Sequence, residues 1–165
     1  MMKSFYFVIF FLLSFIIGCK EQVKIDKETA KAILLTKDDK PLQLPKDKLI
    51  VVNFFAYSCT TCMKEMPILK KVITQDPEFK DKFIIIGMAL DGDKDDLSDP
   101  TFPKYVNNRK NFVRFPVPGT PTTYIIDYRG KKYAVIYGAM PEDQLRKVLK
   151  EAWEKYKKQK EQHGK

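Results

Sequence analysis

Residues 49–69, LIVVNFFAYSCTTCMKEMPIL, join an apolar run to two cysteines and then to a helical pattern. The run from Leu49 to Phe55 is almost wholly apolar, β-branched or aromatic, which is typical of a strand buried on both faces. A helix is predicted over residues 60–74, and Pro67 inside it should kink the helix because proline lacks an N–H. This stretch therefore predicts a buried strand that leads through Cys59 and Cys62 into a helix.

The C-x-x-C spacing of Cys59 and Cys62 indicates reversible thiol–disulfide chemistry. Cys59 falls at the helix N-terminus, where unpaired N–H groups and the helix dipole favour the nucleophilic thiolate. Cys62, one turn later, can close a disulfide and release a partner from a mixed disulfide. A structural disulfide over so short a loop would stabilise little. Zinc normally needs four ligands, and the only other cysteine and the only histidine of the chain are Cys19 and His163. We expect no metal and no cofactor beyond the redox-active Cys59–Cys62 disulfide.

The N-terminus has the features of a secretory signal peptide. A lysine at position 3 precedes an apolar segment over residues 5–17, which is shorter than the ~20 residues of a membrane span. Ile16-Ile17-Gly18-Cys19 resembles the bacterial lipobox, which implies removal of residues 1–18 and a lipid on Cys19. An uncleaved anchor and an ordinary signal peptide are the alternatives.

A lipid anchor would place the protein in the cell envelope, on the extracytoplasmic side, where disulfides persist. In a Gram-negative cell this is the periplasmic side, and Lys20 after the lipid-bearing cysteine resembles an outer-membrane sorting signal. Residues 19–31 are predicted to form a lipidated tether, residues 32–160 one domain, and residues 161–165 a basic tail. The net charge of +9 does not indicate nucleic-acid binding in an exported lipoprotein; the basic end forms a solvated helix face or contacts anionic lipid. We expect a monomer.

The rest of the chain alternates strands and helices. The expected elements are a leading hairpin over 32–45, a buried strand over 83–90, an acidic loop over 91–100, a helix around 102–110, a strand over 122–127, its hairpin partner over 132–137 and a final helix. The final helix carries an apolar stripe at i, i+3, i+4 and i+7 spacing from Leu145 to Tyr156. This order predicts an α/β fold in which helices flank a central mixed β-sheet, preceded by the N-terminal hairpin.

Three motifs together resemble the thioredoxin superfamily, and most of all its membrane-anchored TlpA/ResA-like thiol–disulfide oxidoreductases. They are NFFA before the cysteine pair, Glu65-Met66-Pro67 after it, and GTPTTYIID over residues 119–127. The resemblance covers residues 40–155 and implies a thioredoxin-like fold. It also implies that Pro121 is a cis-proline facing the disulfide, and that the Thr120 backbone offers an extended edge to a partner chain. Tyr57 and the two threonines between the cysteines depart from the family's usual tryptophan and proline.

The resemblance also suggests roles for three residues near the cysteines. An acid at the position of Glu65 lies near the cysteine pair in the ResA-like branch, where it could raise thiol pKa values or relay a proton; a surface glutamate is the alternative. Asn53 stands where many thioredoxins have an aspartate; an amide cannot act as a base, and we expect it to pair with buried backbone groups. Tyr57, with Phe115 and Pro118, is expected either to form an apolar rim for a partner or to lie in the core.

An acidic run raises the possibility of calcium. Asp91, Asp93 and Asp95 have the spacing that begins an EF-hand loop, but Asp96 and Phe102 occupy the positions of its glycine and final glutamate. We therefore expect a solvated loop.

These features predict an envelope-anchored thiol–disulfide oxidoreductase. It would reduce a client protein disulfide through a Cys59 mixed disulfide that Cys62 resolves, and a membrane thiol–disulfide electron donor would re-reduce it. Cytochrome c maturation is one role known in the resembled branch. A thiol oxidase or isomerase, and a non-catalytic thioredoxin-like binding module, are the alternatives.

Overall fold

The computed structural model describes residues 31–163. The predicted signal peptide, the predicted lipidation site Cys19 and all but the last residue of the predicted tether lie outside the described residues. Within residues 31–163, no helix is long and apolar enough to cross a membrane.

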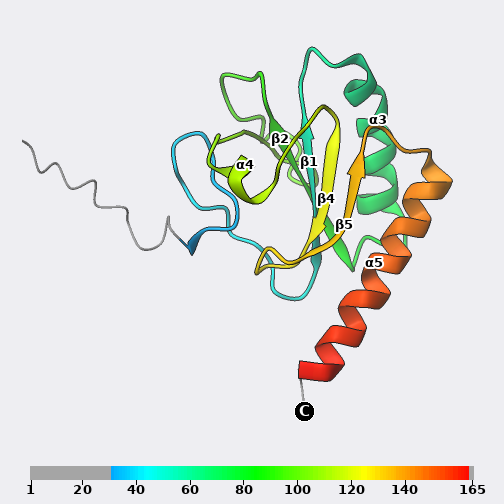
Figure 1. The fold of residues 1–165 in the computed structure, drawn as a ribbon. Helices are drawn as coiled ribbons and strands as arrows, with labels where there is room; N and C mark the ends of the chain where they lie inside the picture. The colour runs from blue at the N-terminus through cyan, green and yellow to red at the C-terminus, as the bar shows by residue number, and fades with distance from the viewer. Residues whose placement is uncertain (1–30, 164–165) are drawn as a thin grey trace, which may run out of the picture.

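A five-stranded mixed sheet forms the centre of the molecule, in the order β3-β2-β1-β4-β5 (Figure 1). The central strand β1 (Leu49–Phe55) runs parallel to β2 (Phe83–Ala89) and antiparallel to β4 (Thr122–Ile126). The edges are β3 (Lys104–Val106), parallel to β2, and β5 (Lys132–Tyr137), antiparallel to β4. The predicted α/β fold with a mixed sheet is confirmed.

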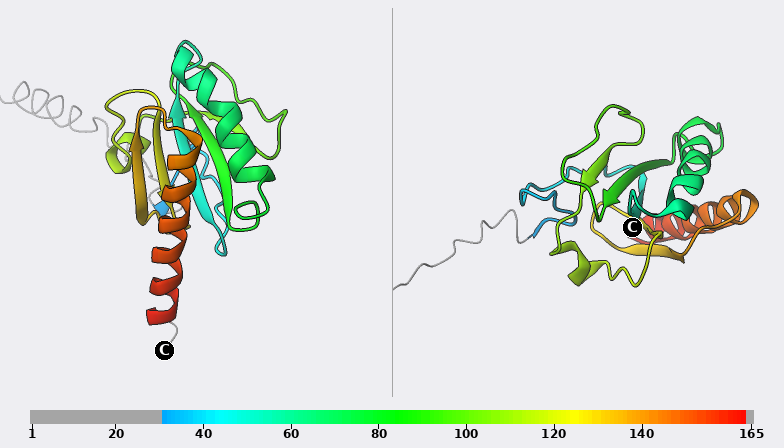
Figure 2. Two further views of the ribbon diagram at one scale, coloured as in Figure 1. Left: turned by 90° about the vertical axis from the view of Figure 1, so that its right-hand side faces the viewer. Right: turned by 90° about the horizontal axis from the view of Figure 1, so that it is seen from above.

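Helices cover both faces of the sheet, which explains why β1 is apolar at nearly every position. Alternate residues of a strand point to opposite faces. Leu49 and Val51 pack with α3 (Thr60–Lys70), the π-helical turn η1 (Lys71–Gln75) and α5 (Glu142–His163). The alternate residues of β1 point to the other side of the sheet. There they face α4 (Asn111–Arg114) and the leading segment (Figures 1 and 2).

The helix predicted over residues 60–74 is present, with a change of helix type near its end. α3 continues through Pro67, and after Lys70 the chain widens into η1. There the N–H of Asp76 donates to the carbonyl of Lys71, five residues earlier, at 3.2 Å. The change from the 3.6-residue turn to a π-turn leaves no apolar signature in the sequence.

The helix predicted around residues 102–110 is wrong. Residues Lys104–Val106 form the edge strand β3, paired in parallel with Gly87, Met88 and Ala89 of β2. The N–H of Asn107 donates to the carbonyl of Ala89 at 2.8 Å and extends this pairing. Hydrogen bonds to a strand distant in sequence outweigh a weak local helical preference, and the helix α4 begins only at Asn111.

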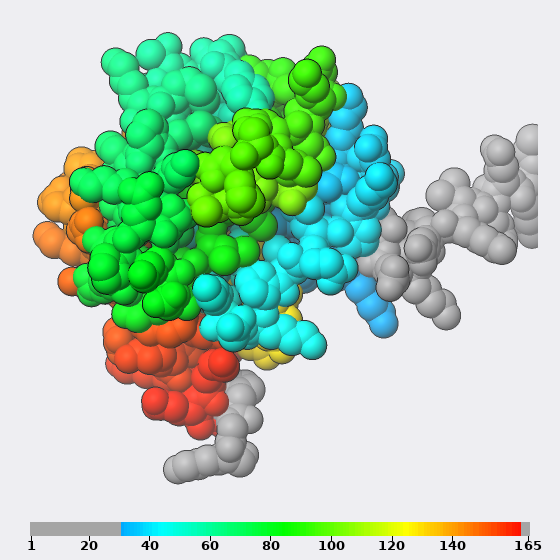
Figure 3. Space-filling model, turned by 180° about the vertical axis from the view of Figure 1, so that it is seen from behind, coloured from blue at the N-terminus to red at the C-terminus, as the bar shows by residue number. Residues whose placement is uncertain are grey.

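The leading hairpin is present but has no extended ladder. Leu35 and Pro41 form an isolated antiparallel bridge around a turn in which Asp39 has a φ of 59°. Asn111 fastens it to the domain, because its amide accepts from the N–H of Leu35 at 2.9 Å and donates to the Leu35 carbonyl at 2.8 Å. Figure 3 shows this segment, in blue and cyan, packed against the chain around β3, and a bridge between Thr36 and Asn107 joins the two.

The final helix has the apolar stripe that was predicted. Leu145, Leu149, Ala152 and Tyr156 are buried against the sheet, and Val148 and Trp153 are partly buried. The helix continues to His163, so residues 161–163 are helical instead of starting a separate tail. Its last turns project beyond the strands (Figure 2).

Candidate active site

The two cysteines lie where β1 passes into α3, and they form a disulfide with their Cα atoms 5.3 Å apart. Cys59 is the N-cap of α3 and is partly exposed, whereas Cys62 is 1% exposed. Cys62 packs against Phe55 at the end of β1 and Ala89 at the end of β2. One sulfur of the pair is therefore open to a partner and the other is enclosed.

The N-terminus of α3 supplies the electrostatic environment of Cys59. The backbone N–H of Cys62 donates to Cys59 Sγ at 3.2 Å. After reduction, this N–H and the positive end of the helix dipole would stabilise a thiolate on Cys59. Cys62, in its apolar surroundings, lacks this help, and burial disfavours its charged form.

The segment before β4 forms the opposite wall of the site. The Thr120–Pro121 peptide bond is cis, as predicted. The carbonyl oxygen of Thr120 lies 3.8 Å from Cys59 Sγ. The hydroxyl of Thr122 donates to the carbonyl of Gly119 at 2.6 Å and fixes this turn. The structure thus brings Thr120 and Pro121 beside Cys59, although 61 residues separate Cys59 from Thr120.

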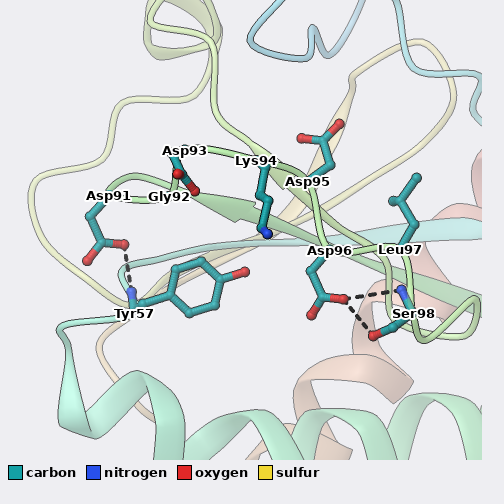
Figure 4. Close-up of a pocket in the computed structure, with 9 residues that line it drawn as sticks. All are labelled: Tyr57, Asp91, Gly92, Asp93, Lys94, Asp95, Asp96, Leu97 and Ser98. Atoms are coloured by element: carbon teal, nitrogen blue, oxygen red, sulfur yellow. Dashed lines mark hydrogen bonds between the residues drawn. The ribbon is translucent and has the colours of Figure 1, made fainter.

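Tyr57 is 42% exposed, and its ring meets the ring of Phe55 edge-on at 5.0 Å. With residues 91–98 it lines an open hollow of about 630 Å³ beside the site (Figure 4). Burial of the phenol raises the pKa of Tyr57, and the carboxylates of Asp96, Asp91 and Asp95 raise it further. Tyr57 therefore lies at the surface beside the site and not in the core, whereas Phe115 is fully buried in the core and Pro118 is exposed.

Asp91 was missed as a site residue by sequence reasoning. Its carboxylate accepts the N–H of Tyr57 at 2.7 Å (Figure 4). It also accepts the N–H of Ser58, just before Cys59, at 2.9 Å. The N–H groups of Ser58 and then Tyr57 lower the pKa of Asp91. The available signal was its position two residues after β2, since the ends of parallel neighbours β1 and β2 meet at one edge of the sheet.

The other acids of this loop support its backbone. Asp95 accepts the N–H of Val106 at 2.7 Å, and Asp96 accepts both the N–H and the hydroxyl of Ser98. Within residues 31–163, no group of three or more histidine, cysteine, aspartate or glutamate side chains is arranged to hold a metal ion.

Glu65 is 5% exposed, so the surface alternative is wrong. Its Oε1 accepts the N–H of Met140, in the loop before α5, at 3.0 Å. Burial raises the pKa of Glu65, and the Met140 N–H offsets part of this rise. Asn53 is 1% exposed and donates from Nδ2 to the hydroxyl oxygen of Thr123 at 2.9 Å. The prediction that Asn53 pairs with backbone groups is wrong: its partner is a side chain on β4.

Comparison with known proteins places these features in a family. The family described as "Thioredoxin-like domain" matches residues 36–153. Thiol-disulfide oxidoreductase ResA of Bacillus thuringiensis subsp. konkukian is 29% identical over 142 residues, which cover 79% of this chain and 80% of that protein. The thioredoxin-like protein YneN of Bacillus subtilis is 28% identical over 124 residues, 70% of this chain and 71% of that one.

The fold has counterparts among solved structures. The exposed lipoprotein thioredoxin Etrx1 of Streptococcus pneumoniae superposes with a TM-score of 0.52 and 21% identity, covering 72% of this chain and 96% of that chain. At this identity the likeness concerns the fold alone.

Proposed function

This chain belongs to the thioredoxin-like family, and from that membership we propose that it is a thiol–disulfide oxidoreductase that reduces protein disulfides in the cell envelope. The observation that carries the proposal is the asymmetric Cys59–Cys62 disulfide, which has its partly exposed sulfur at a helix N-terminus and beside Thr120. ResA, which aligns with four fifths of the chain, is named a thiol-disulfide oxidoreductase.

The chemistry transfers two electrons in two exchange steps. The Cys59 thiolate attacks one sulfur of the client disulfide, and the other client sulfur leaves as a thiolate. The Cys62 thiol then loses its proton and attacks Cys59 Sγ, which forms the intramolecular disulfide and releases the second client thiolate. The Thr120 carbonyl, next to Cys59, is suited to accept a backbone N–H of the client in the mixed disulfide.

Glu65 is proposed as the group that takes the proton from Cys62. It follows Cys62 by three residues, on the same buried face of α3. Its raised pKa brings its proton affinity closer to that of a thiol, which favours transfer in both directions.

The N-terminal motif supports the proposed place of this reaction. A lipid on Cys19 would hold the domain on the extracytoplasmic side of a membrane, and a membrane thiol–disulfide electron donor would restore the dithiol. Cytochrome c maturation, in which apocytochrome thiols must stay reduced, is the client pathway that the resemblance suggests. The electrons travel in the cysteine pair, so the proposal needs no metal or organic cofactor, and it treats the protein as a monomer.

A trapping experiment tests the activity. Cys62→Ser should accumulate a mixed disulfide between Cys59 and a client, because no thiol remains to resolve it. The matched variant Cys59→Ser leaves only the enclosed sulfur and should trap nothing. If both variants trapped clients equally, or neither did after reduction, the assignment of roles would be wrong.

The reduction potential decides the direction of the reaction. We expect a value near that of thioredoxin, about −270 mV, when the protein is equilibrated in thiol–disulfide buffers. A value near that of DsbA, about −120 mV, would instead make the protein a thiol oxidase.

A further inference from the structure

Two buried oxygen atoms near the cysteines have no hydrogen-bond partner. Among the described residues, Asn53 Oδ1 and Glu65 Oε2 are the side-chain atoms that are fully enclosed and unpaired. An enclosed polar atom without a partner destabilises the fold, so a structure that keeps two of them calls for an explanation.

The two residues lie on the surfaces of α3 and the sheet that pack together. The buried residues of α3 are Cys62, Glu65 and Leu69. Cys62, on the turn before Glu65, packs on Phe55, and Leu69, on the turn after it, belongs to the core cluster that contains Val51. Glu65 therefore lies over the part of β1 between these two contacts.

Asn53 occupies this part of β1. It stands between Val51 and Phe55 and has the same parity, so its side chain points to the same face of the sheet. Thr123 is its direct partner in the β1–β4 register. The Met140 N–H holds the other oxygen of Glu65 from the β5–α5 loop, on the side of the sheet where β4 lies.

The surroundings of this group are neutral. Asn53 on β1, Thr123 on β4 and the Met140 N–H carry no charge, and Cys62 on α3 is in the disulfide. The first charged residue after Met140 in the sequence is Glu142 of α5, and it pairs with Lys71 and Arg146. Burial and the Met140 N–H account for the pKa of Glu65, with no contribution from a charged side chain.

We propose that Asn53 is a positioning residue whose amide presents either its oxygen or its NH2 group to Glu65, and so gives a partner to both the protonated and the ionised carboxyl. The idea rests on the proposed function, in which Glu65 exchanges a proton with Cys62. The Thr123 hydroxyl can pair with whichever end of the Asn53 amide is turned away from Glu65, because a hydroxyl both donates and accepts. An aspartate at position 53 would lack the donor that the ionised form needs.

In the oxidised state, the Asn53 amide presents its oxygen to Glu65. When Cys62 attacks Cys59 Sγ, its proton passes to Glu65 Oε2. The new O–H of Glu65 donates to Asn53 Oδ1, while Asn53 Nδ2 donates to Thr123 Oγ1, as the structure shows for the latter bond.

In the reduced state, the Asn53 amide presents its NH2 group to Glu65. When the donor thiolate attacks Cys59 Sγ, Cys62 leaves as a thiolate and takes the proton back from Glu65. The Asn53 amide then turns about its last torsion, Nδ2 donates to the carboxylate, and the Thr123 hydroxyl donates to Oδ1. The group gains and loses a proton without leaving a buried charge unpaired.

The test is a nuclear magnetic resonance titration of the purified full-length protein in detergent, held in the oxidised form. The probes are the side-chain carboxyl carbon of Glu65 and the side-chain NH2 group of Asn53. We expect the Asn53 NH2 signals to shift with the same midpoint as the Glu65 carboxyl, because one N–H changes partner when the carboxyl ionises. In Glu65→Gln, the Asn53 signals should no longer respond in that range.

Asn53→Leu supplies a second measurement. This substitution removes the amide that donates to the carboxylate. The proton affinity of Glu65 should therefore rise at least tenfold, which raises the midpoint of its titration, since hydrogen bonds to charged groups are the stronger ones. The proposal is overturned if the Asn53 signals stay constant while Glu65 titrates, or if Asn53→Leu lowers the midpoint. Neither readout involves turnover, so an inactive protein with a linked titration would contradict the proposed function and leave this inference standing.

Discussion

At the scale of single residues, burial gives the candidate site its chemistry. Glu65 is held inside an apolar interface with one oxygen bonded to Met140, and this burial raises its pKa. A folded protein in which an acid has a raised pKa binds more protons than its unfolded chain once the pH exceeds the ordinary value of that acid. Glu65 should therefore make the protein less stable as the pH rises through its raised pKa.

The substitution Glu65→Gln tests this linkage. The wild-type free energy of unfolding should fall between the ordinary glutamate pKa and the raised value, and the variant should lack this fall because glutamine does not ionise. The difference should approach about 1.4 kcal/mol for each tenfold gain in proton affinity on folding. Urea unfolding of the oxidised proteins across this pH range measures it.

Glu151→Gln is the matched control, because Glu151 is an exposed glutamate of α5. It should leave the pH profile unchanged. A Glu65→Gln profile that runs parallel to the wild type would show that Glu65 keeps its ordinary pKa.

At the scale of elements, the ends of β1 and β2 support the cysteine loop from two directions. Asp91 after β2 holds the backbone of Tyr57 and Ser58, and Phe55 at the end of β1 packs on Cys62. The approach to Cys59 is therefore fixed by contacts from a neighbouring strand as well as by the helix that follows it.

Replacing Asp91 should release this loop. Asp91→Ala removes the acceptor of both N–H groups, and we expect client reduction to slow several-fold while the midpoint of urea unfolding changes little. Asp93→Ala is the control, since among the described residues the Asp93 carboxylate makes no hydrogen bond or ion pair, and its backbone carbonyl, which accepts from Lys37 Nζ, is unchanged by the substitution. Equal rates for the two variants would mean that the loop keeps its shape without Asp91.

A methyl group at Gly87 should disturb the packing that supports the site. A Cβ there would lie 2.9 Å from Phe55 Cε1 and 3.0 Å from Lys104 Cγ. Gly87→Ala should therefore cost about 1–3 kcal/mol of stability, as overpacked cores do. Gly119→Ala, where nothing lies within 4 Å of the added carbon, should cost far less when both are unfolded in urea.

The elements also show which features the sequence could predict. Strong local patterns predict β1, β5 and α5, and the C-x-x-C spacing of the cysteine pair by itself indicates thiol–disulfide chemistry. β3 was missed because only the edge of β2 makes residues 104–106 a strand. The pairing of Asn53 with Thr123 depends on a strand register that joins residues 70 positions apart, and no local pattern encodes it.

At the scale of the whole molecule, α5 closes one face of the sheet with its first four turns. Leu149 is fully buried there, while Glu161 and Gln162 in the last turn are exposed. Stability should therefore depend on the early part of the helix and hardly on its end.

Two changes in α5 compare these parts. Leu149→Ala should cost about 2–5 kcal/mol because it opens a cavity in the core. A chain that ends at Lys160 should lose less than about 0.5 kcal/mol, as is usual for exposed positions. Urea unfolding followed by the fluorescence of Trp153, which packs on Phe83, measures both, and a large loss on truncation would assign a packing role to the last turn.

The difference in exposure between the two sulfurs dictates the order of events in turnover. Cys62 is enclosed and Cys59 is partly open, so the proposed client and the proposed electron donor would each react at Cys59, beside the same Thr120 edge. The client and the donor cannot bind at the same time, so the protein must release one of them before it binds the other. Initial rates should then follow double-displacement kinetics, with parallel lines in double-reciprocal plots, and excess of the reduced client should compete with the donor for the oxidised protein.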